Sequence, residues 1–207
     1  MRDDQGVSGP ENTLAASIGG VRGMVETSAP AVAFVVVYAA SDSDTKLAAG
    51  VAVGLAVLLA LGRLLRGESP RYALSGLFGV GLAAILATVT GKAKNFYLPG
   101  ILANAAYASA FLISIAARHP LVGVIAAQLQ HEPHWRTDPE RMRTYTRASW
   151  LWAGLFLSRL AVQVPLYVAG AVVALGATKT VMGIPLFAVG LWWTYRVVRH
   201  PVVPETA

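Results

Sequence analysis

The sequence predicts an all-α, polytopic integral membrane protein with about six transmembrane helices and both termini in the cytoplasm. First, its 207 residues are 55% hydrophobic and only 14% charged, whereas a soluble domain carries about 25% charged residues. Second, the apolar stretches are continuous, which fits spanning helices of about 20 residues and not the alternating segments of a membrane β-barrel. Third, the arginines gather in alternate links between these stretches.

Six apolar stretches have the length and composition of membrane-spanning helices. They cover residues 24–40, 47–65, 73–90, 97–117, 150–172 and 181–198. Polar links separate them, including a link at residues 176–180 before the last stretch. Residues 121–129 are too short to span and are expected to lie in the interface or to continue the fourth helix past a kink. Residues 131–147 are expected to form a charged loop.

The six stretches form one predicted transmembrane domain, residues 23–199, between cytoplasmic tails at residues 1–22 and 200–207. Apolar residues recur at helical spacing near the end of the first tail, at Leu14, Ile18, Val21 and Val25. This spacing predicts an interfacial helix, although a tail without fixed structure fits it equally well. The first twenty residues lack the basic start and apolar core of a cleavable signal peptide.

The basic residues decide the predicted orientation. Twelve of the thirteen arginines lie in the tails, in the links that follow the second and fourth spans, or at the span ends next to these segments. The four lysines are expected on the opposite side, at positions Lys46, Lys92, Lys94 and Lys179. Because loops rich in positive charge stay in the cytoplasm, both termini are expected there. The protein is expected in the cell (inner) membrane, with the lipid bilayer as its first partner.

The thirteenth arginine, Arg159, lies near the middle of the fifth predicted span. A charge at that depth costs roughly 2.5 to 3.5 kcal/mol on insertion scales, so a partner or a wet cavity is expected beside it. Four further residues share its helical face at spacings of three or four: Trp152, Phe156, Gln163 and Tyr167. Glu26, just inside the first span, is the only acidic residue within a predicted span.

Two interpretations of these residues remain open. In the first, Arg159 and Gln163 line a polar pathway or ligand cavity, and Glu26 serves as their counter-ion or proton carrier. In the second, Arg159 and Glu26 form a buried structural ion pair that fixes helix packing. Whether the two touch is left open, since Glu26 lies much closer to the cytoplasmic side and only an arginine side chain that reaches toward that side would close most of the gap. Asn104, on the fourth span, is expected to make an interhelical hydrogen bond.

A second polar group lies at the predicted outer surface. Lys92, Lys94 and Asn95 precede a helix that opens near Pro99, and a helix N-terminus carries partial positive charge. Together they could bind an anionic lipid headgroup or a small solute. The alternative is that the lysines only anchor a tight turn at the membrane interface.

The sequence contains no motif of a catalytic, cofactor or metal site. A P-loop, a GxGxxG turn, a GxSxG elbow and paired acids within the spans are all absent. His131 and His134 do not have HExxH spacing, and Pro133 between them disfavours a helix. With no cysteine, disulfides and thiolate chemistry are excluded. We therefore expect no enzyme, no cofactor, no metal and no nucleic-acid partner, because the basic loops are explained by membrane orientation.

Three segments carry a resemblance to a known family. They are GGVRGMVETSAP at residues 19–30, TGKAKNFYLPGILAN at residues 90–104, and the segment from Ser149-Trp-Leu-Trp to Val164-Pro-Leu-Tyr. In these segments the chain resembles the actinobacterial membrane proteins of domain of unknown function 3159. The resemblance implies a multi-span inner-membrane protein and supplies no substrate or catalytic residue. The proline-bearing first span is more faintly similar to intracellular septation protein A, which is linked with envelope synthesis and division.

Two functions are compatible with these observations. The first is a small secondary transporter or channel-like protein with a polar cavity around Arg159, built from two inverted three-span halves. The second is a membrane scaffold in cell-envelope assembly or septation, with envelope proteins as its partners. The sequence names neither a substrate nor an oligomeric state.

Overall fold

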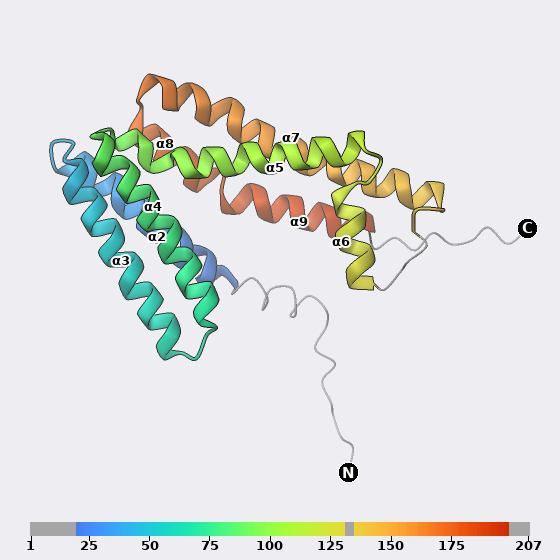
Figure 1. The fold of residues 1–207 in the computed structure, drawn as a ribbon, viewed down its shortest axis with the longest axis horizontal. Helices are drawn as coiled ribbons and strands as arrows, with labels where there is room; N and C mark the ends of the chain where they lie inside the picture. The colour runs from blue at the N-terminus through green and yellow to red at the C-terminus, as the bar shows by residue number, and fades with distance from the viewer. Residues whose placement is uncertain (1–19, 131–134, 199–207) are drawn as a thin grey trace, which may run out of the picture. The chain divides into compact units, whose positions relative to one another are not determined.

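The structure is a computed structural model that describes residues 20–130 and 135–198 (Figure 1). In those residues it contains α-helices and one short 3-10 helix, and no strand, so the all-α prediction is confirmed. The helices are α2 (Gly20–Ala40), α3 (Thr45–Leu65), α4 (Pro70–Thr90), η1 (Ala93–Tyr97), α5 (Leu98–Ala116), α6 (Leu121–Gln130), α7 (Pro139–Ala169), α8 (Val172–Val181) and α9 (Ile184–Val198). The predicted tails at residues 1–22 and 200–207 lie almost entirely outside the described residues, as do His131 and His134.

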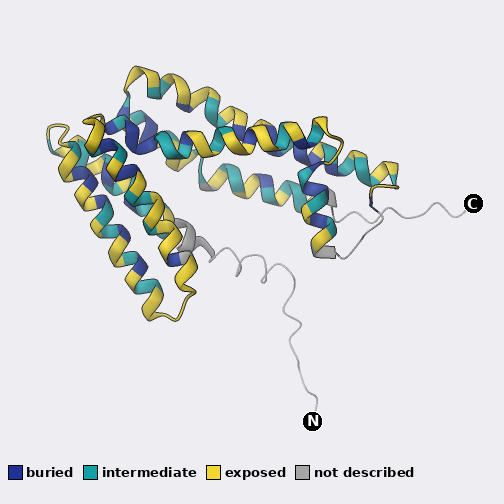
Figure 2. Cartoon of the chain, viewed as in Figure 1, coloured by how far each residue is buried: buried dark blue, intermediate teal, exposed yellow. Residues whose placement is uncertain are grey.

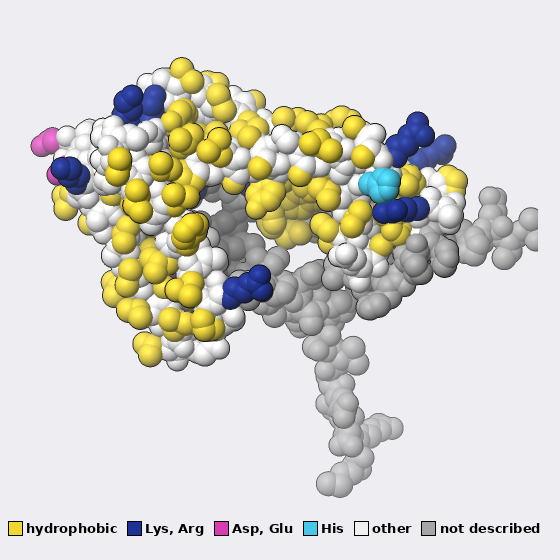
Figure 3. Space-filling model, viewed as in Figure 1, with side chains coloured by type: hydrophobic (Ala, Val, Ile, Leu, Met, Phe, Trp, Pro, Cys, Tyr) yellow, Lys and Arg dark blue, Asp and Glu magenta, His cyan; other side chains and the backbone are white. Residues whose placement is uncertain are grey.

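The polytopic membrane class is also confirmed. Five segments of the described chain are long and apolar enough to cross a membrane: Thr45–Leu65, Ala73–Thr90, Ala93–Ala116, Pro139–Ala169 and Val172–Arg196. The predicted first span is represented by a shorter apolar segment, Glu26–Ala40, within α2. Many positions on these helices are exposed (Figure 2), and large hydrophobic side chains are among them. Hydrophobic side chains cover much of the surface in view, with few charged groups among them (Figure 3). A lipid bilayer is the environment that suits such a surface.

The chain forms two compact units, Met1–Phe96 and Tyr97–Ala207. The sequence predicts one domain at residues 23–199, so the division is a feature that the structure adds. The boundary falls between the third and fourth predicted spans. Each unit therefore contains three of the six predicted spans.

In the first unit, α3 packs against both α2 and α4 (Figure 1). Its buried positions are alanines at a spacing of mostly four residues: Ala48, Ala52, Ala56 and Ala60, with Ala49 beside them. Small side chains let helix backbones approach closely, which is how membrane helices gain packing energy. Asp44 begins α3 as an N-cap, because its carboxylate accepts hydrogen bonds from the amides of Lys46 and Leu47.

In the second unit, α5 and α7 lie side by side, and α9 packs on α7 (Figure 1). The core between them is aromatic, with Trp152 of α7 stacked near Phe111 and edge-on to Phe187. The Trp152 indole nitrogen donates a 3.0 Å hydrogen bond to Thr194 of α9. The short helix α6 is fixed through Ser149, whose hydroxyl accepts a hydrogen bond from the α6 amide of Val122 at 3.2 Å. This core holds the inner face of α7 in place.

The charged loop predicted at residues 131–147 is wrong over most of its length, because α7 begins at Pro139. Asp138 caps this helix, accepting hydrogen bonds from the amides of Glu140 and Arg141, and a proline suits the first helical turn. The helix also ends earlier than the predicted Val172. It stops at Ala169, since Gly170 adopts the left-handed conformation at φ 73°.

The last predicted span and its link are also wrong in their boundaries. Residues 176–180, predicted as a link, belong to α8, and the helix break falls instead at Met182 and Gly183. Lys179 therefore lies in the last turn of α8, within the candidate span Val172–Arg196, and not in an external link. The last span is a discontinuous helix made of α8 and α9. Backbone exposed at such a break requires hydrogen-bond partners inside a membrane.

Candidate functional site

Arg159 supplies a hydrogen-bond partner at the helix break. Its Nη2 atom donates a 2.7 Å hydrogen bond to the carbonyl oxygen of Gly183. The same oxygen accepts a longer bond, 3.3 Å, from the amide of Phe187 in the first turn of α9. Arg159 lies ten residues before the end of α7, or about 15 Å along the helix at 1.5 Å per residue. Arg159 therefore contacts the break between α8 and α9 at a point far from the end of a candidate span.

Glycine at position 183 is required by a close backbone approach. A Cβ atom placed on Gly183 would lie 2.6 Å from the carbonyl oxygen of Lys179, which real Cβ contacts do not tolerate. The amides of Met182 and Gly183 close the end of α8 by donating to the carbonyls of Thr178 and Thr180. Pro185 then occupies the second position of α9, where its missing N–H costs nothing.

The face of α7 that bears Arg159 points into the second unit. Trp152, Phe156 and Gln163 on this face are buried, and Arg159 and Tyr167 are partly buried. The burial of this face agrees with the prediction that a helical face carrying polar groups is turned toward protein or water and away from lipid. The face is aromatic on one side of Arg159 and polar on the other.

Gln163 contacts the neighbouring helix. Asn104 of α5 donates from Nδ2 to Oε1 of Gln163 at 3.4 Å, which is a long hydrogen bond between two membrane helices. Gln163 is only 6% exposed and lies one turn beyond Arg159. The interhelical hydrogen bond expected for Asn104 is thus present, and its partner belongs to the same polar face as Arg159.

A second cation lies in the last turn of α8. The Nζ atom of Lys179 is 5.6 Å from the centroid of the Tyr97 ring, within reach of a cation–π interaction. Tyr97 ends η1 and is 2% exposed. Lys179 thus adds a positive charge within the candidate span Val172–Arg196, as Arg159 does within Pro139–Ala169.

The contacts of Arg159 offset only part of the cost of its charge. A charge deep in a bilayer costs roughly 2.5 to 3.5 kcal/mol or more, and one hydrogen bond from a charged group contributes about 1.5 to 3 kcal/mol. The Arg159 Nε atom is buried and has no hydrogen-bond partner among the residues that the structure describes. The guanidinium is held in position, therefore, but its donors are not all used.

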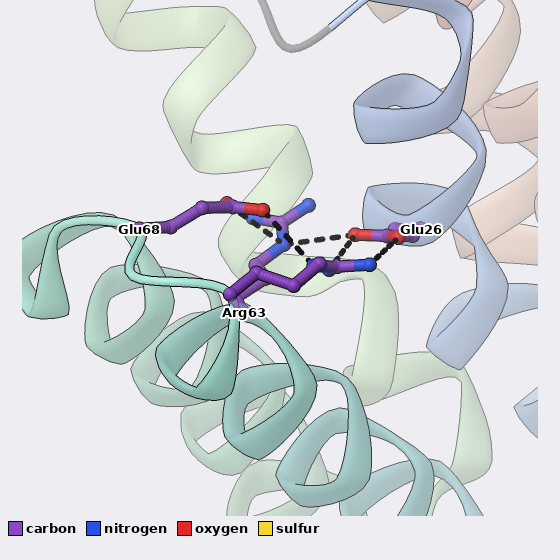
Figure 4. Close-up of polar contacts among 4 residues, drawn as sticks. Glu26, Arg63 and Glu68 are labelled. Atoms are coloured by element: carbon purple, nitrogen blue, oxygen red, sulfur yellow. Dashed lines mark hydrogen bonds and ion pairs between the residues drawn. The ribbon is translucent and has the colours of Figure 1, made fainter.

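Glu26 forms an ion-pair cluster inside the first unit (Figure 4). Its carboxylate lies 3.1 Å from Nε of Arg63, in the last turn of α3. Arg66, which follows α3, donates to both Glu26 oxygens at 3.2 Å. Glu68 lies 3.3 Å from Arg66 and 4.0 Å from Arg63. The cluster ties α2 to the end of α3, so Arg63 and Arg66 are cations with which the structure places Glu26.

The residues predicted to form an outer anion site, Lys92, Lys94 and Asn95, differ in their surroundings. The Asn95 side chain is buried and donates to the Thr90 hydroxyl at 2.8 Å, which closes the turn between α4 and η1. Lys92 is exposed, and Lys94 is partly buried. The side-chain amide of Asn95 is therefore committed to the turn.

The structure describes no metal centre. Within residues 20–130 and 135–198, no group of three or more His, Cys, Asp or Glu side chains lies together in a way that could hold a metal ion.

Comparison with known proteins places the chain in a family. A family model described as "protein of unknown function" matches residues 18–205, which is nearly the whole chain. The chain belongs to the DUF3159 family. No curated protein and no solved structure matches it significantly. The matched range contains Arg159, Gly183 and Glu26.

In this DUF3159 protein, sequence reasoning did not identify the partners of the two key charged residues. For Arg159 a signal was present: Gly183-Ile-Pro185 interrupts an apolar segment, and a residue before proline disfavours helix. For Glu26, the arginines at positions 63 and 66 looked like ordinary orientation signals. Only the fold shows that α2 and α3 bring them together.

Proposed function

We propose that this DUF3159 protein is a membrane transport protein, either a small secondary transporter or a channel-like protein. Its substrate site would lie where Arg159 meets the break between α8 and α9. The observation that carries the proposal is the 2.7 Å hydrogen bond from Arg159 to the Gly183 carbonyl, deep in a candidate span.

Discontinuous helices support this proposal for a physical reason. Non-helical backbone is tolerated at membrane depth only where protein or a water-filled cavity surrounds it. In many transporters the substrate site lies at such breaks, because helix ends offer partial charges and free backbone groups to a solute. A protein that needed only a stable bundle would more simply carry an uninterrupted apolar helix here. The buried pair of Gln163 and Asn104 extends the polar face by one turn.

The contacts of Glu26 change its proposed part in the mechanism. Two arginines of its own unit neutralise its carboxylate, which favours a structural role over that of a proton carrier paired with Arg159. We therefore propose that Glu26 holds α2 on α3, and that substrate recognition depends on Arg159 and Gln163.

A flux experiment tests the proposal. The purified full-length protein is reconstituted in liposomes, and movement of a panel of small anions, cations and neutral solutes is measured under imposed proton, sodium and voltage gradients. At least one solute is expected to move with the wild type and not with Arg159→Gln. Arg196→Gln is the matched control, since Arg196 lies exposed near the end of α9 over the Trp192 ring.

The competing account is a scaffold in envelope assembly or septation. If no solute moves with well-folded wild-type protein, and crosslinking in cells captures envelope-synthesis proteins, the scaffold account replaces transport.

A further inference from the structure

We infer that the Arg159 site binds a small soluble oxyanion, through a carboxylate or phosphate group. This inference rests on the proposed transport function and specifies the class of substrate. It is drawn from the balance of charge around Arg159 and from the geometry of its guanidinium.

In the second unit no carboxylate lies within the predicted spans at residues 97–117, 150–172 and 181–198, so Arg159 has none at its depth. The sequence contains no Asp or Glu between Glu68 and Glu132, and none between Glu140 and Glu205. The acid of the first span, Glu26, is engaged by Arg63 and Arg66. Buried charges in proteins are normally paired. A bound anion would supply the negative charge that the apolar segments of this unit lack.

The geometry of the guanidinium suits an oxyanion. Arginine presents a planar fork of N–H donors that matches the two oxygens of a carboxylate or phosphate. In Arg159, Nη2 is fixed on the Gly183 carbonyl, and the buried Nε makes no hydrogen bond to any described residue. The group is thus oriented by the helix break, with donor capacity left for a ligand.

Neighbouring groups add positive potential. Lys179 brings a second cation to the last turn of α8, and the N-terminal end of α9, which starts directly after Gly183, carries partial positive charge. These groups add positive charge to the same unit, while the C-terminal end of α8 adds a partial negative charge at the break. The full charge of Arg159 itself would repel a cationic substrate.

The depth of Arg159 favours a soluble anion over a lipid headgroup. The residue lies ten positions from the end of α7, which is about 15 Å and half of a hydrocarbon core of about 30 Å. Headgroup phosphates lie at the surface of that core. An anion that reaches Arg159 therefore comes from water.

Anion binding can be measured on the purified full-length protein by thermal unfolding. Sodium phosphate and sodium acetate serve as probes, each titrated against sodium chloride at constant ionic strength. The wild type is expected to gain thermal stability saturably with at least one probe. Arg159→Gln is expected to weaken that binding about tenfold or more, as the loss of a charged hydrogen bond predicts. Arg159→Lys should be intermediate because it keeps the charge without the fork, and Arg196→Gln should equal the wild type.

The outcomes separate this inference from the proposed function. No saturable stabilisation, or equal stabilisation of Arg159→Gln, overturns the anion site. If Arg159→Gln does not fold, the comparison of Arg159→Lys with the wild type decides in the same way.

The source of the anion is tested in nanodiscs of phosphatidylglycerol or phosphatidylcholine. If the protein is stabilised only by phosphatidylglycerol and the free probes have no effect, the site binds a lipid and the inference is overturned. Movement of cations or neutral solutes alone in the flux panel overturns the substrate class while transport stands. Anion binding without any flux keeps the site and removes transport.

Discussion

The guanidinium of Arg159 on α7 donates a 2.7 Å hydrogen bond to the backbone carbonyl of Gly183, at the break between α8 and α9. This contact joins the one charge in the middle of α7 to the one interruption of the last candidate span. Each feature is costly in a bilayer by itself, and each partly offsets the cost of the other. Their coupling is the basis of the predictions for the second unit.

Replacing Gly183 is expected to disturb this contact by distorting the backbone. In Gly183→Ala, the new Cβ would lie 2.6 Å from the Lys179 carbonyl oxygen, so the end of α8 must move, at a cost of about 1 to 3 kcal/mol. Thermal unfolding in detergent measures the loss. The control is Gly154→Ala on α7, where the added methyl meets nothing within 4 Å. Equal stability of the two variants would show that the break tolerates a side chain.

The ion-pair cluster of the first unit is expected to contribute to stability and not to transport. Glu26→Gln removes the charge that Arg63 and Arg66 share, and the expected loss is about 1 to 3 kcal/mol because the Glu26 side chain is only 14% exposed. Glu68 contacts the same arginines, but its side chain is 47% exposed. The loss of stability in Glu68→Gln should therefore not exceed about 1 kcal/mol. Abolished flux in a Glu26→Gln protein of wild-type stability would restore Glu26 to the mechanism.

The contact between Asn104 and Gln163 is expected to couple α5 to α7 weakly. A double-mutant cycle with Asn104→Ala and Gln163→Ala measures the interaction energy in unfolding experiments. Hydrogen bonds between membrane helices average about 0.6 kcal/mol, and the 3.4 Å length here predicts a value no larger. A coupling well above that would mean that the pair is shorter or more extensively bonded in the membrane.

The orientation predicted from the arginines can be tested directly, because the chain has no native cysteine. A single cysteine in Lys46→Cys, at the start of α3, should react with an impermeant thiol reagent from outside intact cells. A cysteine in Ser69→Cys, just before α4, should react only after the cells are opened. The reverse pattern would invert the topology and place both termini outside.

The sequence predicted the spans where local signals suffice and failed where tertiary contacts decide. Continuous apolar runs and polar links located α3, α4 and α5 to within a few residues. The start of α7 was missed although Asp138-Pro139 is an N-cap signal, because the charge of the following residues suggested a loop. Lys179 was assigned to a link for the same reason, since a cation within a membrane helix is improbable until the fold shows its surroundings.

The candidate site was predicted only in part. Helical periodicity correctly grouped Arg159 with Gln163 on one face of α7, and that face is turned toward protein. Periodicity within one helix cannot identify a partner on another, so the Gly183 carbonyl was not foreseen. The pairing of Glu26 with Arg63 and Arg66 depends in the same way on how α2 meets α3.

The most direct test of a water-accessible site at Arg159 is thiol labelling one turn away. The Gln163→Cys variant is treated with a membrane-impermeant thiol reagent from each side of oriented vesicles, and Val162→Cys is the control, since Val162 is exposed on the outer surface of α7. Gln163 is only 6% exposed in this structure, so labelling reports a conformation that admits water to this face. We predict labelling of Gln163→Cys from at least one side and none of Val162→Cys. No labelling of either variant, in protein that melts like the wild type, would contradict a transport site at Arg159.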